Sequence, residues 1–155
     1  MTDKLSIEIV TTNESSELAP VTYIYKDDKY AGASFHGVPG GHEFTSFVLA
    51  LYNSAGPGQQ IDDQSKMDIA KIEKPLDIKV LVSLSCTMCP ELVASAQRIA
   101  CESENVTCEV YDIAHFESLK TKYNVMSVPC IIFNDEKVHF GKKNIPQLLE
   151  IIKSL

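Results

Sequence analysis

The sequence predicts an α/β fold in which a buried strand runs directly into a helix at a Cys-Thr-Met-Cys motif. Residues 77–85 (DIKVLVSLS) are rich in apolar and β-branched residues, which is typical of a buried strand. Apolar residues then recur at helical spacing after Pro90, and a further strand, helix, strand, strand and helix follow. The order predicted for residues 76–155 is therefore βαβαββα.

Each of these elements has its own local signal. Pro90 is tolerated in the first turn of a helix, where its missing N–H would have no partner. Val128-Pro129 leads into a hairpin with a polar turn at residues 134–136, and Gly141 closes that hairpin. The last helix has apolar residues at i, i+3, i+4 and i+7 from Ile145. The elements are expected at residues 77–85, 92–100, 106–113, 116–123, 130–133, 137–140 and 145–152.

The first half of the chain repeats the later part of this order without the cysteine pair. A proline, Pro20, precedes a strand, a turn, a second strand, a glycine and an amphipathic helix. Pro20 and Gly32 are twelve positions apart, as are Pro129 and Gly141, although Gly37 is an equally good counterpart of Gly141.

These observations predict two copies of one fold in a single chain. Residues 4–10 are expected to be the strand before Pro20, while the opening strand and helix of this copy are absent. We interpret residues 1–58 as a truncated, inactive copy, residues 59–75 as a linking helix that Pro75 ends, and residues 76–155 as the active domain.

Composition limits the function classes. The 155 residues carry a net charge of −7, which argues against non-specific binding to nucleic acid or to an anionic membrane. No apolar run approaches the roughly 20 residues that a membrane span needs, and no secretory signal is expected. Five cysteines in such a chain point to a reducing compartment, so we expect a cytoplasmic protein.

The chemistry is expected at Cys86 and Cys89. A strand that ends at a helix N-terminus places Cys86 where unpaired N–H groups and the helix dipole favour the thiolate. In such motifs the thiol pKa falls from about 8.5 to roughly 3.5–7.5. Because the thiolate is the attacking species, Cys86 is the predicted nucleophile, and Cys89 is expected to resolve the mixed disulfide.

The same spacing leaves two alternatives open, a metal site and a pair of inert thiols. A redox role is favoured by the strand–motif–helix context and by Val128-Pro129 some 40 residues later. A zinc site is disfavoured because no second Cys-x-x-Cys or His-x-x-x-His lies nearby. Neither His36 nor His42 has the spacing of a metal ligand.

Pro129 is expected to follow a cis peptide bond, because a trans proline fits poorly at the start of a core strand. A cis bond would turn the backbone of Ser127 and Val128 toward the cysteine pair, where it could hold an extended substrate segment. The alternative is a simple strand-start proline. Met88 and Met126 flank the expected site and offer an adaptable apolar docking surface, which Thr87 adjoins.

Two stretches carry a resemblance to a known family: GVPGGHEFTSFVLAL at 37–51 and LSCTMCP at 84–90. They are similar to the N-terminal domain of the alkyl hydroperoxide reductase flavoprotein, and the tandem protein disulfide oxidoreductases are more distant relatives. The resemblance implies two fused thioredoxin-like folds, of which the second is active. It implies that Cys86 and Cys89 are the active dithiol, Pro129 the cis-proline, and Glu43 the acid that the inactive half offers toward the disulfide.

The resemblance also implies the partners. A flavoprotein disulfide reductase would donate electrons and a peroxiredoxin disulfide would accept them. No cofactor is expected on this chain, which lacks a GxGxxG motif, so FAD and NAD(P)H would be held by a partner. By residue type alone, Glu43 is also explained as a partner of the helix dipole. A general reductant of thioredoxin or glutaredoxin type and a metal-binding or docking module remain as alternative functions.

Three other cysteines lie outside the motif. Cys101, Cys108 and Cys130 are expected to be core thiols, as free cysteine often is. Cys130 stands directly after the expected cis-proline, where a small inert residue would fit the family pattern. The alternative for Cys130 is a third thiol close enough to Cys89 to trap or regulate it.

Overall fold

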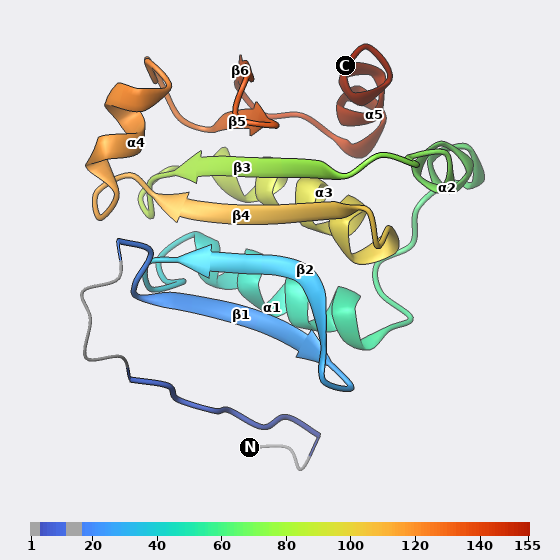
Figure 1. Cartoon of the computed structure of the whole chain (residues 1–155), viewed down its shortest axis with the longest axis horizontal. Coiled ribbons are helices and arrows are strands. Elements are labelled where there is room, and N and C mark those ends of the chain that lie inside the picture. The colour runs from blue at the N-terminus through green and yellow to red at the C-terminus, as the bar shows by residue number, and fades with distance from the viewer. Residues whose placement is uncertain (1–3, 12–16) are drawn as a thin grey trace.

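A single mixed sheet organises the computed structural model, which describes residues 4–11 and 17–155 (Figure 1). Its strand order is β1-β2-β4-β3-β5-β6. The strands are β1 (Val21–Lys26), β2 (Lys29–His36), β3 (Leu76–Val82), β4 (Val106–Asp112), β5 (Cys130–Phe133) and β6 (Lys137–Phe140). The helices are α1 (Glu43–Ala55), α2 (Asp63–Ala70), α3 (Cys89–Glu102), α4 (Glu117–Lys122) and α5 (Ile145–Lys153).

The predicted βαβαββα order of the second half is confirmed, and the fold class is the predicted thioredoxin-like α/β class. The order β3-α3-β4-α4-β5-β6-α5 matches it element by element, with bounds that differ by a few residues. In the sheet, β3 pairs in parallel with β4 and antiparallel with β5. Since β3 is thereby central, the cysteine motif that follows it lies at the middle of one sheet edge (Figure 1).

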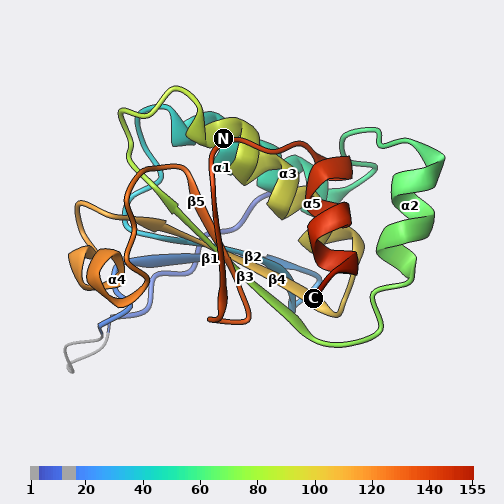
Figure 2. The same cartoon turned by 90° about the horizontal axis from the view of Figure 1, so that it is seen from above.

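The first half joins this sheet through β2. The strands β2 and β4 pair in parallel, from Ala33 opposite Cys108 to His36 opposite Tyr111. The hairpin β1–β2 therefore extends the same sheet, and α1 lies beside α3 on the same side of it (Figure 2). This arrangement brings the first turn of α1 to the sheet edge from which α3 also starts.

Alternate residues of the strands supply two apolar clusters, one on each face of the sheet. The larger cluster lies under α1, α3 and α5 and includes Ile78, Val80 and Phe133. The smaller cluster lies under α4 and includes Leu81 and Ile132. A strand that is buried on both faces has a continuous apolar run in its sequence, which explains the apolar and β-branched composition of residues 77–85.

Each of the two hairpins has an equivalent hydrogen bond from a glycine to a proline. The N–H of Gly37 donates to the carbonyl of Pro20 at 2.8 Å, and the N–H of Gly141 donates to the carbonyl of Pro129 at 2.9 Å. Gly37 is therefore the counterpart of Gly141. The equal twelve-residue spacing from Pro20 to Gly32 is a coincidence, because β1 and β2 are longer than β5 and β6.

The strand predicted before Pro20 is not present. Residues 4–11 are outside any strand, and their apolar side chains, such as Ile7 and Ile9, are exposed. A strand forms only when a neighbour pairs with its backbone hydrogen-bonding groups, and no described strand pairs with this segment. Residues 12–16 and 1–3 lie outside the described part of the chain.

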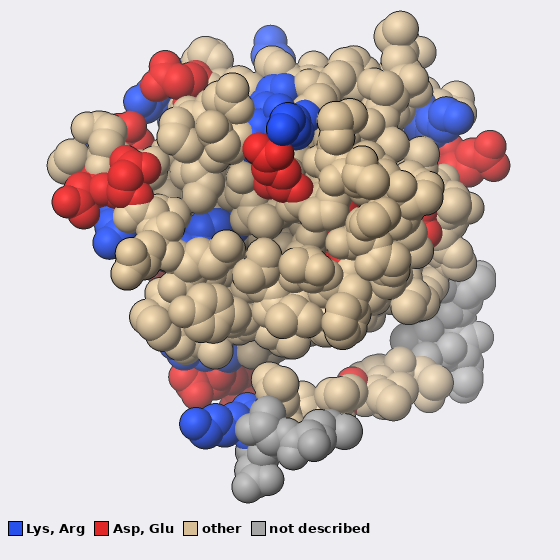
Figure 3. Space-filling view, turned by 180° about the vertical axis from the view of Figure 1, so that it is seen from behind, with Lys and Arg blue, Asp and Glu red and all other residues tan. Residues whose placement is uncertain are grey.

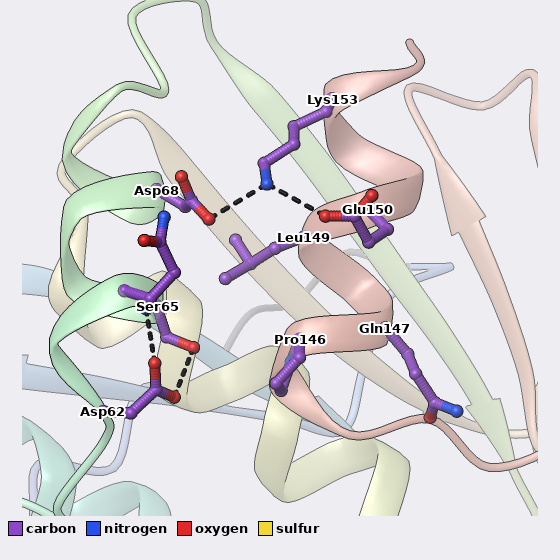
Figure 4. Close-up of a pocket in the computed structure, with 9 residues that line it drawn as sticks. Asp62, Ser65, Asp68, Pro146, Gln147, Leu149, Glu150 and Lys153 are labelled. Atoms are coloured by element: carbon purple, nitrogen blue, oxygen red, sulfur yellow. Dashed lines mark hydrogen bonds and ion pairs between the residues drawn. The ribbon is translucent and has the colours of Figure 1, made fainter.

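The linking segment forms α2, which packs against α5 (Figure 4). The helix expected over residues 59–75 is shorter than predicted, since α2 ends at Ala70, five residues before Pro75. Asp62 caps α2 by accepting hydrogen bonds from the backbone N–H and the hydroxyl of Ser65. Across the shallow hollow between the two helices, Lys153 forms ion pairs with Asp68 at 3.0 Å and with Glu150 at 2.9 Å. No described helix is long and apolar enough to cross a membrane.

The buried pairing of β2 with β4 predicts that the first half contributes strongly to stability. Phe35 is 3% exposed and packs edge-on against Phe47 at 5.6 Å. We expect Phe35→Ala to lower the free energy of unfolding by about 3–5 kcal/mol, as for other buried phenylalanines. Urea unfolding followed by circular dichroism measures it, and Phe140→Ala on the exposed edge strand β6 is the control. Equal small effects of both variants would contradict the prediction.

Candidate functional site

Cys86 and Cys89 form a disulfide at the start of α3, with their Cα atoms 5.5 Å apart. The helix begins at Cys89, so Cys86 lies in the preceding turn, where its N–H donates to the carbonyl of Ser83 at 2.9 Å. Cys86 is half-buried and Cys89 is fully buried. This difference fits the predicted roles, in which an accessible thiolate attacks first and a shielded thiol attacks second.

The structure brings the other predicted site residues of the second half to the same place. The peptide bond between Val128 and Pro129 is cis, as predicted. Cys130 pairs with Leu81 in the antiparallel ladder, so Pro129 stands at the end of β3, where the cysteine turn begins. Val128 and Cys86 pack against the same apolar cluster.

The exposed side chains of the site are apolar or small. Met88 is 51% exposed and Met126 is 81% exposed, and Thr87 and Ser127 are exposed as well. Methionine adapts its shape to different partners, which makes these residues suitable for a docking surface.

The loop between β2 and α1 is fixed against the cysteine turn. The N–H of His42 donates to the carbonyl of Leu84 at 3.0 Å, two residues before Cys86. Gly41 has φ +54°, and a Cβ at this position would lie 2.5 Å from the same carbonyl oxygen. Only glycine fits so close an approach in this backbone conformation. The GGHE sequence therefore positions the first turn of α1 beside the cysteine turn.

Glu43 begins α1 and is 1% exposed. It lines a small cavity that Val82 and Leu84 also line. Neither carboxylate oxygen has a hydrogen-bond partner among the described residues. Burial raises the pKa of the Glu43 carboxyl above its usual value, and the nearby Ser46 hydroxyl opposes part of this rise. The placement agrees with the direction implied by the resemblance, and the catalytic role itself remains a prediction.

The sheet separates Cys130 from the disulfide, Cys101 lies near the far end of α3, and Cys108 lies on β4 within the same apolar cluster as Cys89. Cys108 and Cys130 are buried, as predicted, whereas Cys101 is half-buried, with its sulfur 3.4 Å from the Ser54 hydroxyl. Cys130 belongs to the cluster under α4, and Cys89 belongs to the cluster under α1 and α3. The alternation of side chains in β5 therefore points Cys130 away from Cys89, and the structure does not support a trapping role.

Sequence reasoning missed three buried polar residues. Ser46 and Gln97 lie on the buried faces of α1 and α3. Helical periodicity predicts these faces from their apolar residues and gives no signal for a polar residue among them. His36 ends β2 and stacks on Tyr111 at 4.1 Å. A signal for Ser46 existed in its spacing of three from Glu43, which puts the two side chains on one helix face.

Within the described part of the chain, no group of three or more His, Cys, Asp and Glu side chains is arranged to hold a metal. The arrangement that is present is a disulfide at a helix N-terminus, near a cis-proline, with the start of α1 hydrogen-bonded to the cysteine turn. Together with the fold, it defines a dithiol–disulfide oxidoreductase of the thioredoxin class.

Comparison with known proteins agrees with this class. Residues 76–155, more than half of the chain, match the family described as thioredoxin domain, and the chain belongs to that family. The AhpF component of alkyl hydroperoxide reductase from Pseudomonas aeruginosa is 30% identical over 149 residues, which are 96% of this chain. The chain spans only 28% of the length of that protein.

Two solved structures show that the likeness extends over both halves. The NTD_N/C domain of the alkyl hydroperoxide reductase AhpF from Enterococcus faecalis has a TM-score of 0.77 and 38% identity, covering 80% of this chain and 59% of its own. A protein disulfide oxidoreductase from Aeropyrum pernix has a TM-score of 0.73 and 25% identity, covering 78% of this chain and 54% of its own.

The close approach of Gly41 to Leu84 leads to a prediction about both stability and reactivity. Gly41→Ala adds a clash with the Leu84 carbonyl to the strain of a positive φ. Gly141→Ala is the matched control, because its φ is +81° and no atom lies within 4 Å of the added Cβ. We expect G141A to cost about 1 kcal/mol of unfolding free energy and G41A clearly more. Only G41A is expected to slow the reaction of the reduced Cys86 with a disulfide reagent.

The surroundings of the free cysteines predict their reactivity. Burial raises the pKa of the Cys130 thiol to about 11, so little thiolate forms at pH 8. In the reduced native protein we expect iodoacetamide to label Cys86 first and to leave Cys108 and Cys130 unmodified. Mass spectrometry of the labelled protein measures this order, and labelling in urea provides the control. Rapid native labelling of Cys130 would contradict its placement in the core.

Proposed function

We propose that the Cys86–Cys89 dithiol passes electrons from a flavoprotein disulfide reductase to a peroxiredoxin disulfide. The observation that carries the proposal is the likeness over 96% of the chain, both halves included, to the AhpF component of alkyl hydroperoxide reductase. Because the chain spans 28% of that protein, FAD and NAD(P)H are assigned to a separate partner or module. We place the reaction in the cytoplasm, where free thiols such as Cys101 are kept reduced.

The division of labour follows the two copies. We propose that residues 1–58 form the truncated inactive half, residues 59–75 the linking segment and residues 76–155 the active domain. Support comes from the matching Pro–Gly hydrogen bonds of the two hairpins. The inactive half would contribute Glu43 to the active site and complete the sheet through β2.

The electron transfer consists of two exchange steps. The Cys86 thiolate attacks one sulfur of the peroxiredoxin disulfide, forms a mixed disulfide and releases the other sulfur as a thiolate. Cys89 then attacks Cys86; the Cys86–Cys89 bond forms, the mixed disulfide breaks, and the second peroxiredoxin sulfur leaves as a thiolate. The proton of the Cys89 thiol passes to the Glu43 carboxylate, which we assign as its acceptor. The peroxiredoxin gains two electrons, and the flavoprotein then reduces the Cys86–Cys89 disulfide.

The substrate would dock against the surface around the disulfide. The backbone of Ser127 and Val128 would hold an extended segment of the partner, while Thr87 and Met88 contact its side chains. The helical side of the molecule carries few charged side chains (Figure 3). On α1, Phe44 and Val48 are exposed one turn apart and extend the apolar character of this side.

A general disulfide reductant is the second candidate, and the likeness to the Aeropyrum pernix protein disulfide oxidoreductase favours it. The two candidates differ in the substrates that they reduce quickly. A dedicated donor reduces a peroxiredoxin much faster than insulin, whereas a general reductant reduces both at comparable rates.

The test is the rate at which the fully reduced protein reduces an oxidised two-cysteine peroxiredoxin, measured beside its rate on insulin. We expect a fast reaction with the peroxiredoxin alone. Cys86→Ser should abolish it, and Cys89→Ser should stop it at a stable mixed disulfide. Cys101→Ser is the control, because this thiol lies near the end of α3 remote from the motif. No reaction with either substrate would overturn the redox assignment, and equal rates would favour the general reductant.

A further inference from the structure

The interface between α1 and α3 contains polar side chains that are buried without partners. The three residues are Glu43 and Ser46 on α1 and Gln97 on α3, and we call them the interhelix polar layer. Each is at most 1% exposed. Among the described residues, both Glu43 oxygens, the Ser46 hydroxyl and both polar atoms of the Gln97 amide have no hydrogen-bond partner.

The register of the two helices places this layer beside the disulfide. Both helices start at the same sheet edge, and the Ser54 hydroxyl lies 3.4 Å from the sulfur of Cys101. Three helical turns contain about eleven residues. Eleven residues before Ser54 on α1 stands Glu43, and eleven residues before Cys101 on α3 stands Pro90. This register places Glu43 level with the first turn of α3, which begins with the buried Cys89, and the cavity that Glu43 lines reaches Leu84 in the segment before Cys86.

The same register brings Gln97 and Ser46 together. One turn back from the contact between Ser54 and Cys101, Ala50 stands opposite Gln97. Long helical side chains point toward the N-terminus of their helix, so the Gln97 amide extends from Ala50 toward Ser46. Ser46 is one turn from Glu43 on the same face of α1. The polar atoms thus form a line that leads from Gln97 past Ser46 to Glu43.

Five buried polar atoms without partners would be costly. Each costs about 1–3 kcal/mol, and native proteins satisfy such atoms with one another or with buried water. The layer offers two kinds of donor, the Ser46 hydroxyl and the Gln97 amide, and one strong acceptor, the Glu43 carboxylate. The composition of the layer therefore matches hydrogen bonding to the ionised form of Glu43.

We propose that Ser46 and Gln97 are positioning residues that hold the Glu43 carboxylate toward Cys89, through buried water that joins the three side chains. The inference rests on the proposed dithiol chemistry, in which Glu43 accepts the proton of Cys89. The other titratable residues that line the Glu43 cavity are His36 and Asp112, from the ends of β2 and β4. Neither residue is changed in the variants below, so differences between these variants report the layer.

The two steps of the reaction with dithiobis(nitrobenzoate) separate the roles of the two cysteines. In the reduced protein, Cys86 attacks first and releases one thionitrobenzoate; Cys89 then displaces the second. The second phase needs the Glu43 carboxylate, so its rate rises with pH through the pKa of Glu43. Gln97→Met removes a donor to the carboxylate and disfavours its ionised form. We expect the midpoint of the second phase to move up by about one pH unit, and the first phase to stay unchanged.

Three further variants make the test specific. Ser46→Ala removes a single oxygen and should shift the midpoint in the same direction without endangering the fold. Gln60→Met alters an exposed loop glutamine and should shift nothing. In a Glu43→Gln background, Gln97→Met should cause no additional shift, because the group that it acts on is gone. Near-ultraviolet circular dichroism verifies that each variant is folded.

A direct measurement of the water completes the test. In the oxidised protein, the side-chain amide of Gln97 should show a nuclear Overhauser effect to a long-lived water, and this effect should disappear in Gln97→Met. No water contact, an unchanged midpoint in Gln97→Met, or an equal shift in the Glu43→Gln background would each overturn the proposal. Because the reagent replaces the peroxiredoxin, failure of the proposed partner would leave these results unaffected.

Discussion

The parallel pairing of β2 with β4 is the interaction on which the rest of the structure depends. It joins a short hairpin to a complete thioredoxin-like domain, so that one apolar cluster serves both. A hairpin alone is only marginally stable in water, whereas a hairpin that extends a sheet and is covered by a helix is stable. The pairing also fixes where α1 starts. Since the chain leaves β2 at the same edge at which it leaves β3, Glu43 and the cysteine turn become neighbours.

Burial then determines how the site behaves. Removing the Glu43 carboxyl from water raises its pKa, and a carboxyl with a raised pKa is a better proton acceptor near neutral pH than an exposed one. Burial also lowers the thiolate fraction of other cysteines; it raises the pKa of the Cys108 thiol, for example. Cys86 differs from them by being accessible at a helix start. We therefore expect the environment of each thiol to make Cys86 more reactive than the buried cysteines.

Much of this could be predicted from the sequence because the decisive signals were local. The strand at 77–85, the motif after it and the cis-proline position are each defined by a few adjacent residues. The prediction of a strand at residues 4–10 was wrong because strand formation depends on a neighbouring strand that the local pattern does not reveal. The equivalence of Gly37 with Gly141 likewise needed the hydrogen bonds to the two prolines, since two candidate glycines fitted the sequence equally well.

The interhelix polar layer shows a different limit. Helical periodicity predicts the buried face of a helix from its apolar residues, and it does not predict which polar residues on that face are functional. Two such polar residues on separate helices become meaningful only when the sheet brings the helices together and buries their polar atoms without partners. A buried polar group that served no purpose would be replaced by an apolar residue at little cost or even a gain in stability. In the proposed reaction, this layer would support the carboxylate that accepts the proton of Cys89.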